Sequence, residues 1–217
     1  RPCITEMGGK NACIVRARGD LERAVAGIVR SAFGLTGQKC SALSRVYVEE
    51  SVASELLERL VAATRAITVG DPTRREVWMG PLINEGAARS FATFCDQLES
   101  AGGRILLGGE RLVDGDLAHG HFAACTVAEA PPDHPLYQIE MFAPILMVCR
   151  VKDLREGVAL ANASSLGLTA GCYGSEEEVR VFLDTIEAGV LYVNRPQGAT
   201  TGAWPGYQAF GGWKGSG

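Results

Sequence analysis

Residues 143–151 read APILMVCRV, a run in which Arg150 is the one charged residue. Such a nearly continuous apolar run is typical of a strand that is covered on both faces, as the strands of a parallel sheet are. Shorter apolar segments at residues 12–15, 169–173 and 190–193 are also predicted to be strands. The run at 143–151 therefore predicts a sheet buried between two layers.

Segments with helical spacing alternate with these strands. Asp20 is predicted to cap a helix in which Leu21, Val25 and Ile28 recur at helical intervals. Further helices are predicted at residues 51–67, 84–101, 153–163 and 176–187, and further strands at 45–49, 104–107 and 122–127. This alternation predicts the α/β class: an open, mostly parallel sheet with helices on both faces. Because no linker, repeat or low-complexity segment interrupts the 217 residues, we expect one domain.

The composition is that of a globular domain, with 47% hydrophobic and 21% charged residues. The net charge of −4 arises from mixed signs along the chain, which argues against a nucleic-acid-binding surface. No apolar run reaches membrane-spanning length, so no membrane partner is expected. The sequence begins RPCITE, without Met, which suggests a fragment or a processed chain.

The seven cysteines are scattered and show no C-x-x-C spacing, so neither a disulfide framework nor a zinc site is predicted. Most of them lie in apolar surroundings and are predicted to be core residues. His119 and His121 have no carboxylate or cysteine at ligand spacing, so no metal is expected there either. Reduced thiols indicate the cytoplasm, or an organelle that keeps thiols reduced.

One cysteine has a different setting. Residues 37–42 (GQKCSA) form a small polar turn between a predicted helix and a predicted strand. Cys40 in this turn is accessible to substrate, and Lys39 and backbone N–H groups could favour its thiolate. The alternative is an ordinary small residue in a turn.

Glu6 precedes Met7 and two glycines. Glycine leaves space for a neighbouring side chain to move, so Glu6 could act as a general base near a reactive thiol. The alternative is a surface carboxylate before a turn.

Taken together, these motifs resemble the aldehyde dehydrogenase superfamily. Residues 6–11 (EMGGKN) and 37–42 agree with it in order and in separation. Further matching segments extend the resemblance along essentially the whole chain: residues 80–83 (GPLI), 140–144 (EMFAP), 166–171 (LGLTAG) and 210–212 (FGG).

The resemblance implies a reaction. Cys40 matches the family nucleophile, which forms a thiohemiacetal with the aldehyde and then, after hydride transfer to NAD or NADP, a thioester. Glu6 matches the base that activates water for hydrolysis of the thioester. The backbone N–H of Cys40 matches one oxyanion donor. Glu140 and Phe142 match contacts at the nicotinamide end of the cofactor, through the ribose hydroxyls and the ring. The family pattern Glu-Glu-x-Phe-Gly-Pro is altered here at Ile139 and Ala143.

A narrower resemblance concerns the substrate. Residues 194–212 are similar to the Δ1-pyrroline-5-carboxylate dehydrogenase branch, which oxidises glutamate γ-semialdehyde to glutamate. In that branch a serine beside the cysteine and a Gly-Ala pair hold the substrate α-carboxylate, and backbone N–H groups suit an anion. The residues that match this anchor are Ser41, Gly202 and Ala203, and the resemblance also implies that Phe210 binds the substrate. Residues 196–200 are longer than the usual spacer, and Ala209 replaces a usual proline.

The resemblance also sets limits. It implies that residues 1–217 are a catalytic domain without the dinucleotide-binding domain and the final oligomerisation strand, so the isolated piece should not turn over. It implies a homo-oligomer for the full-length protein.

Other functions stay open: another semialdehyde or a general aldehyde as substrate, a cofactor-free cysteine esterase or thioesterase, or an inactive family member. Residues 211–217 (GGWKGSG) lack the spacing of a phosphate-binding loop and are expected to line the substrate mouth.

Overall fold

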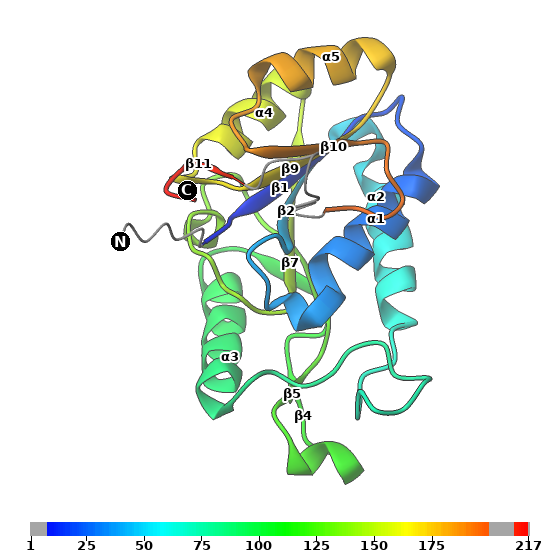
Figure 1. Cartoon of the computed structure of the whole chain (residues 1–217), viewed down its shortest axis with the longest axis vertical. Helices are drawn as coiled ribbons and strands as arrows, with labels where there is room; N and C mark the ends of the chain where they lie inside the picture. Colours follow the sequence, from blue (N-terminus) through cyan, green and yellow to red (C-terminus); the bar gives the residue numbers. More distant parts are fainter. Residues whose placement is uncertain (1–7, 200–210, 217) are drawn as a thin grey trace, which may run out of the picture.

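A single large sheet lies at the centre of the chain (Figure 1). The computed structural model describes residues 8–199 and 211–216. Seven strands follow the order β10-β9-β1-β2-β7-β6-β3, and every neighbouring pair is parallel except β3 with β6. Their bounds are β1 (Asn11–Val15), β2 (Leu43–Glu49), β3 (Arg104–Leu107), β6 (Thr126–Glu129), β7 (Ile145–Val151), β9 (Thr169–Tyr173) and β10 (Val190–Val193).

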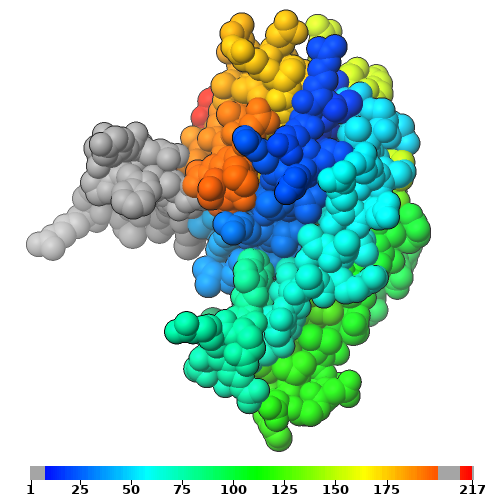
Figure 2. Space-filling view, turned by 90° about the vertical axis from the view of Figure 1, so that its right-hand side faces the viewer, coloured from blue at the N-terminus to red at the C-terminus, as the bar shows by residue number. Residues whose placement is uncertain are grey.

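Helices cover both faces of this sheet. They are α1 (Leu21–Phe33), α2 (Glu50–Arg65), α3 (Glu85–Ser100), α4 (Leu154–Asn162) and α5 (Glu176–Thr185). One apolar core packs beneath α1 and α2, and a second packs beneath α3, α4 and α5. Figure 2 shows α1 and α2 side by side on one surface of the molecule. The prediction of an open, mostly parallel sheet with helices on both faces is confirmed.

The packing of strand β7 explains why residues 143–151 are apolar at nearly every position. Successive side chains of a strand point to opposite faces. Ile145, Met147 and Cys149 enter the core under α3, α4 and α5, whereas Leu146 and Val148 enter the core under α1 and α2. Both faces of β7 are therefore buried, as the continuous run of apolar residues predicts.

The helices begin where the sequence supplies N-cap side chains. Asp20 and Asp153 accept hydrogen bonds from backbone N–H groups of the first turns of α1 and α4. Asn84 does the same for α3, and Ser175 forms a capping box with Glu178 at α5. Within the described residues no helix is both long and apolar enough to cross a membrane.

The prediction of one strand at 122–127 is wrong. The chain there forms β5 (Phe122–Ala123), which pairs with β4 (Arg111–Leu112), and then β6 of the large sheet. The backbone moves from one sheet to the other between them, which a run of apolar residues does not indicate. The short strands β8 (Leu166–Gly167) and β11 (Trp213–Lys214) also pair, and three 3₁₀ turns complete the elements of the described chain: η1 (Gly34–Gly37), η2 (Gly115–His119) and η3 (Pro135–Tyr137).

Two ion pairs of Arg16 lie at the carboxyl ends of the central strands. After β1 the chain continues into α1 on one face, and after the adjacent β9 it continues into α5 on the other. Ligands of open α/β sheets commonly bind at such a switch point. Here Arg16 lies at that point, with its guanidinium 3.0 Å from Glu49 and 2.9 Å from Glu178. The usual binding crevice is thus occupied by the protein's own side chains.

Candidate active site

The predicted site residues that the structure describes are Cys40, Ser41, Glu140 and Phe142, and they lie at the opposite edge of the sheet, where the parallel strands begin (the amino edge). Gly9 closely precedes β1, Cys40 lies just before β2, and Glu140 and Phe142 lie just before β7. Since β1, β2 and β7 are parallel neighbours, the residues before them meet at one edge. The register and the order of the strands therefore bring together segments that lie far apart in the sequence.

Cys40 occupies a tight turn. The N–H of Ala42 donates to the carbonyl of Lys39 at 3.0 Å, which closes the turn around Cys40 and Ser41. Among the six cysteines in the described part of the chain, Cys40 alone is not buried. Burial raises the pKa of the thiols of Cys95, Cys125 and Cys172 to about 12, which keeps them protonated and inert near neutral pH. Cys40 is accordingly the thiol best placed to react.

Lys39 is the cation beside this thiol. Helix α1 ends at Phe33, before η1 and the turn, so Cys40 is not at a helix N-terminus. Burial lowers the pKa of Lys39, and the neighbouring Cys40 acts in the opposite direction by favouring the ammonium. The positive charge available to a Cys40 thiolate in the described structure therefore comes from a side chain and not from a helix dipole.

Glu140 and Phe142 lie on the loop before β7. The Glu140 carboxylate accepts a hydrogen bond from the N–H of Gly9 at 2.9 Å. Phe142 has a left-handed backbone with φ of 50°, and its side chain is exposed. Such a conformation is strained for a bulky residue, and strain of this kind clusters at functional sites. A hollow of about 10 Å³ between this loop and the Cys40 turn is lined by Gly9, Lys39 and Glu140 among others.

Some predicted site residues cannot be placed. Glu6, Gly202, Ala203 and Phe210 lie outside the described residues, and their roles stay predictions. Ser41 is described and is buried, directly beside Cys40. No cluster of three potential metal ligands occurs among residues 8–199 and 211–216.

The structure adds two buried basic side chains behind the site, Arg45 and Lys10. Arg45 donates to the carbonyls of Lys10 and, at 3.2 Å, of Ala161, which lies in the last turn of α4. The negative end of the helix dipole thus faces the guanidinium. Lys10 is buried, and its Nζ has no hydrogen-bond partner within the described part of the chain. Burial first, and then Arg45, lower the pKa of Lys10, while Glu140 opposes them.

Two further side chains hold backbone at this edge. The Asn11 amide bonds to the Cys40 turn, and Ser216 Oγ donates to the carbonyl of Gly8 at 2.8 Å. Sequence reasoning missed both residues. A polar residue at the buried start of β1 was the available signal for Asn11, whereas Ser216 gains its role from a contact with a residue at the other end of the chain.

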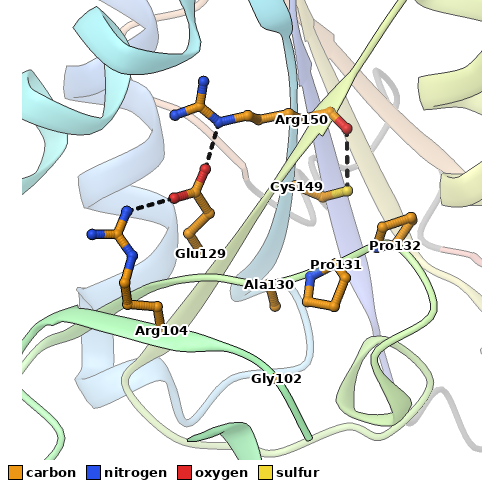
Figure 3. A pocket seen from close by; sticks show the side chains of 8 residues that line it. All are labelled: Gly102, Arg104, Glu129, Ala130, Pro131, Pro132, Cys149 and Arg150. Atoms are coloured by element: carbon orange, nitrogen blue, oxygen red, sulfur yellow. Dashed lines mark hydrogen bonds and ion pairs between the residues drawn. The ribbon is translucent and has the colours of Figure 1, made fainter.

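A larger hollow, of about 450 Å³, lies elsewhere, near the end of the sheet formed by β6 and β3 (Figure 3). Glu129 lies there between two arginines, 2.8 Å from Arg104 and 2.5 Å from Arg150. Burial alone would raise the pKa of Glu129, but hydrogen bonds from Arg150 and Arg104 hold it below its usual value. These charges pair with one another, and the hollow contains none of the predicted site residues.

The described residues form a mostly parallel α/β domain. At the amino edge of its sheet a half-buried cysteine lies beside a glycine-rich segment and the loop that carries Glu140 and Phe142. This fold and this site together define the class of protein. The chain belongs to the aldehyde dehydrogenase family, whose model matches residues 1–217.

Individual similar proteins show which members of this family the chain resembles. The chain is 38% identical over 216 residues to 1-pyrroline-5-carboxylate dehydrogenase of Geobacillus thermodenitrificans, covering 99% of this chain and 40% of that protein. A solved structure of 1-pyrroline-5-carboxylate dehydrogenase from Thermus with bound NAD matches with a TM-score of 0.89 and 37% identity, over 97% of this chain and 40% of that one. The structure of HpcC from Thermus thermophilus matches with a TM-score of 0.91 and 33% identity, over 98% and 41%. The chain thus spans about 40% of the length of the curated relatives it matches.

Proposed function

We propose that this chain is the cysteine-bearing catalytic domain of an NAD- or NADP-dependent aldehyde dehydrogenase that oxidises glutamate γ-semialdehyde to glutamate. The observation that carries the proposal is the position of Cys40. It is the accessible thiol of the described chain, and it shares the amino edge of the sheet with Gly9, Glu140 and Phe142. The similarity to 1-pyrroline-5-carboxylate dehydrogenases supports the choice of substrate.

The chain's own residues perform the covalent chemistry in this proposal. The Cys40 thiolate attacks the aldehyde carbon, and the oxyanion that forms accepts a hydrogen bond from the backbone N–H of Cys40. Glu6, which we assign as the general base, takes the proton of the water that hydrolyses the thioester. The segment that follows Glu6 meets the nucleophile turn at this edge, since Gly9 packs against the Cys40 carbonyl.

The described residues fit the nicotinamide end of the cofactor. Glu140 offers a second carboxylate oxygen beyond the one that holds Gly9, and the Phe142 ring is exposed on the same loop. A carboxylate accepts hydrogen bonds from ribose hydroxyls, and an exposed ring can pack on a planar heterocycle. When bound, NAD(P) supplies the acceptor for the hydride.

The substrate carboxylate is assigned to Ser41, Gly202 and Ala203, with Phe210 against the aliphatic part. Ser41 adjoins Cys40 in a turn of fixed shape, so an anion held there would place its distal aldehyde at a defined distance from the thiol. We further propose that the intact protein supplies a dinucleotide-binding domain and forms a homo-oligomer in the cytoplasm.

A substrate panel on the intact protein tests this function. Glutamate γ-semialdehyde and uncharged aldehydes of similar length are compared as substrates, with reduced cofactor measured by absorbance. We expect Cys40→Ser to abolish oxidation and Cys95→Ala, which changes a buried thiol in helix α3, to retain it. Equal kcat/KM values for charged and uncharged aldehydes would refute the proposed binding of the substrate carboxylate. Full activity of Cys40→Ser would refute the proposed role of Cys40 as the nucleophile.

A further inference from the structure

The Asn11 side chain joins three backbone segments at the site. Its Nδ2 donates to the carbonyl of Cys40 at 2.7 Å and to the carbonyl of Ala42 at 2.8 Å. Its Oδ1 accepts from the N–H of Thr169, at the start of β9, at 2.9 Å. Asn11 is only 2% exposed. One buried amide therefore ties the nucleophile turn to the starts of β1 and β9.

The Cys40 carbonyl is also confined from a second direction. A Cβ atom placed on Gly9 would lie 2.0 Å from this carbonyl oxygen, so the backbone of Gly9 is in close contact with it. The turn itself is closed by the bond from Ala42 N–H to Lys39. Because Asn11 binds the carbonyls of both Cys40 and Ala42, the turn cannot shift along β2 without breaking two hydrogen bonds to a buried side chain.

The contacts require an amide at this position. An asparagine amide provides two N–H donors and one acceptor oxygen, which match the two carbonyls and one N–H found here. An ionised aspartate has the same shape and would still accept the hydrogen bond from Thr169 N–H. Its second oxygen, however, would repel the carbonyl oxygens of Cys40 and Ala42. A serine offers a single donor on a shorter side chain.

We propose that Asn11 is a positioning residue, which fixes the Cys40 turn against the sheet and so sets the place from which the sulfur attacks. This inference rests on the proposed aldehyde oxidation. Asn11 touches neither substrate nor cofactor in this role. Its effect is on geometry alone, and a displacement of about 1 Å at a reacting group can cost about 100-fold in rate.

The test compares Asn11→Asp with a matched control in the intact protein. Asn162 also donates through Nδ2, to the Thr185 carbonyl at 2.9 Å, and accepts through Oδ1, from Glu187 N–H at 2.9 Å, but contacts no part of the Cys40 turn in the described structure. We expect Asn11→Asp to lower kcat by about 100-fold relative to Asn162→Asp, with KM changed by less than about threefold. The kcat of Asn11→Ser should lie between those of Asn11→Asp and Asn162→Asp. If Asn11→Asp does not fold, Asn11→Ser takes its place in the comparison.

Alkylation of Cys40 separates positioning from a structural role. Iodoacetamide needs only an accessible thiolate. In Asn11→Ser, which adds no charge beside the thiol, its rate constant with Cys40, followed by mass spectrometry, should stay within about threefold of wild type while kcat falls. Faster alkylation by more than about tenfold, with a lowered melting temperature, would show an unfolded turn and overturn the inference. A kcat equal to that of Asn162→Asp would also overturn it and leave the proposed function intact. A wild-type protein that oxidises no aldehyde would refute the proposed function, and the positioning role with it.

Discussion

Gly9→Ala is the substitution for which the structure gives the clearest steric prediction. The added Cβ would lie 2.0 Å from the Cys40 carbonyl oxygen and 2.9 Å from Asn11 Nδ2. Cβ atoms essentially never approach other heavy atoms within 3.0 Å, so the two segments must separate by about 1 Å. Neither neighbour is the free end of a flexible side chain, since one is backbone and the other is a buried amide with three hydrogen bonds.

The expected cost has two parts. Overpacking a buried contact of this kind lowers the free energy of unfolding by about 1–3 kcal/mol. Displacing the nucleophile by about 1 Å lowers kcat by about 100-fold. Because the backbone of Gly9 is not left-handed, an alanine there carries no conformational penalty of its own, and the effect is steric.

The assay pairs guanidinium unfolding with steady-state aldehyde oxidation by the intact protein. The control is Gly80→Ala, whose added Cβ would meet Pro72 side-chain atoms at 3.4 Å, an ordinary contact. We expect the control to match wild type in both measurements. If Gly9→Ala has the unfolding free energy and kcat of Gly80→Ala, the close approach of Gly9 to Cys40 is wrong.

Three further predictions concern stability. Arg45→Leu leaves buried carbonyls of Lys10 and Ala161 without their donor and should lower the free energy of unfolding by about 2–3 kcal/mol in a denaturant titration. Burial raises the pKa of Cys125 to about 12. Above pH 9 the unfolded state therefore loses this proton first, and the free energy of unfolding falls as pH rises. Cys125→Ala should reduce that fall by at most about 1.4 kcal/mol per pH unit, and an unchanged slope would contradict the raised pKa of Cys125. Ser175→Ala removes the capping box of α5 and should cost about 1 kcal/mol, measured by thermal unfolding; no loss would mean that the cap contributes nothing.

Much of the fold could be predicted from local sequence. The run at 143–151 is apolar at successive positions because both faces of β7 are buried, and Asp20, Asp153 and Ser175 mark helix starts because each supplies a side-chain oxygen to free N–H groups. The strand predicted at 122–127 failed because partner choice decides where β5 ends and β6 begins, and those partners are distant in sequence.

Local motifs were also enough to identify the family and to single out Cys40, because the segments that carry the chemistry are short and continuous in the chain. The edge of the sheet that holds the site follows instead from strand order and parallel register, which no local segment encodes. The same is true of Asn11. Its residue type is visible in the sequence, but its role depends on the Cys40, Ala42 and Thr169 backbones meeting around one buried amide, where each donor and acceptor must find a partner.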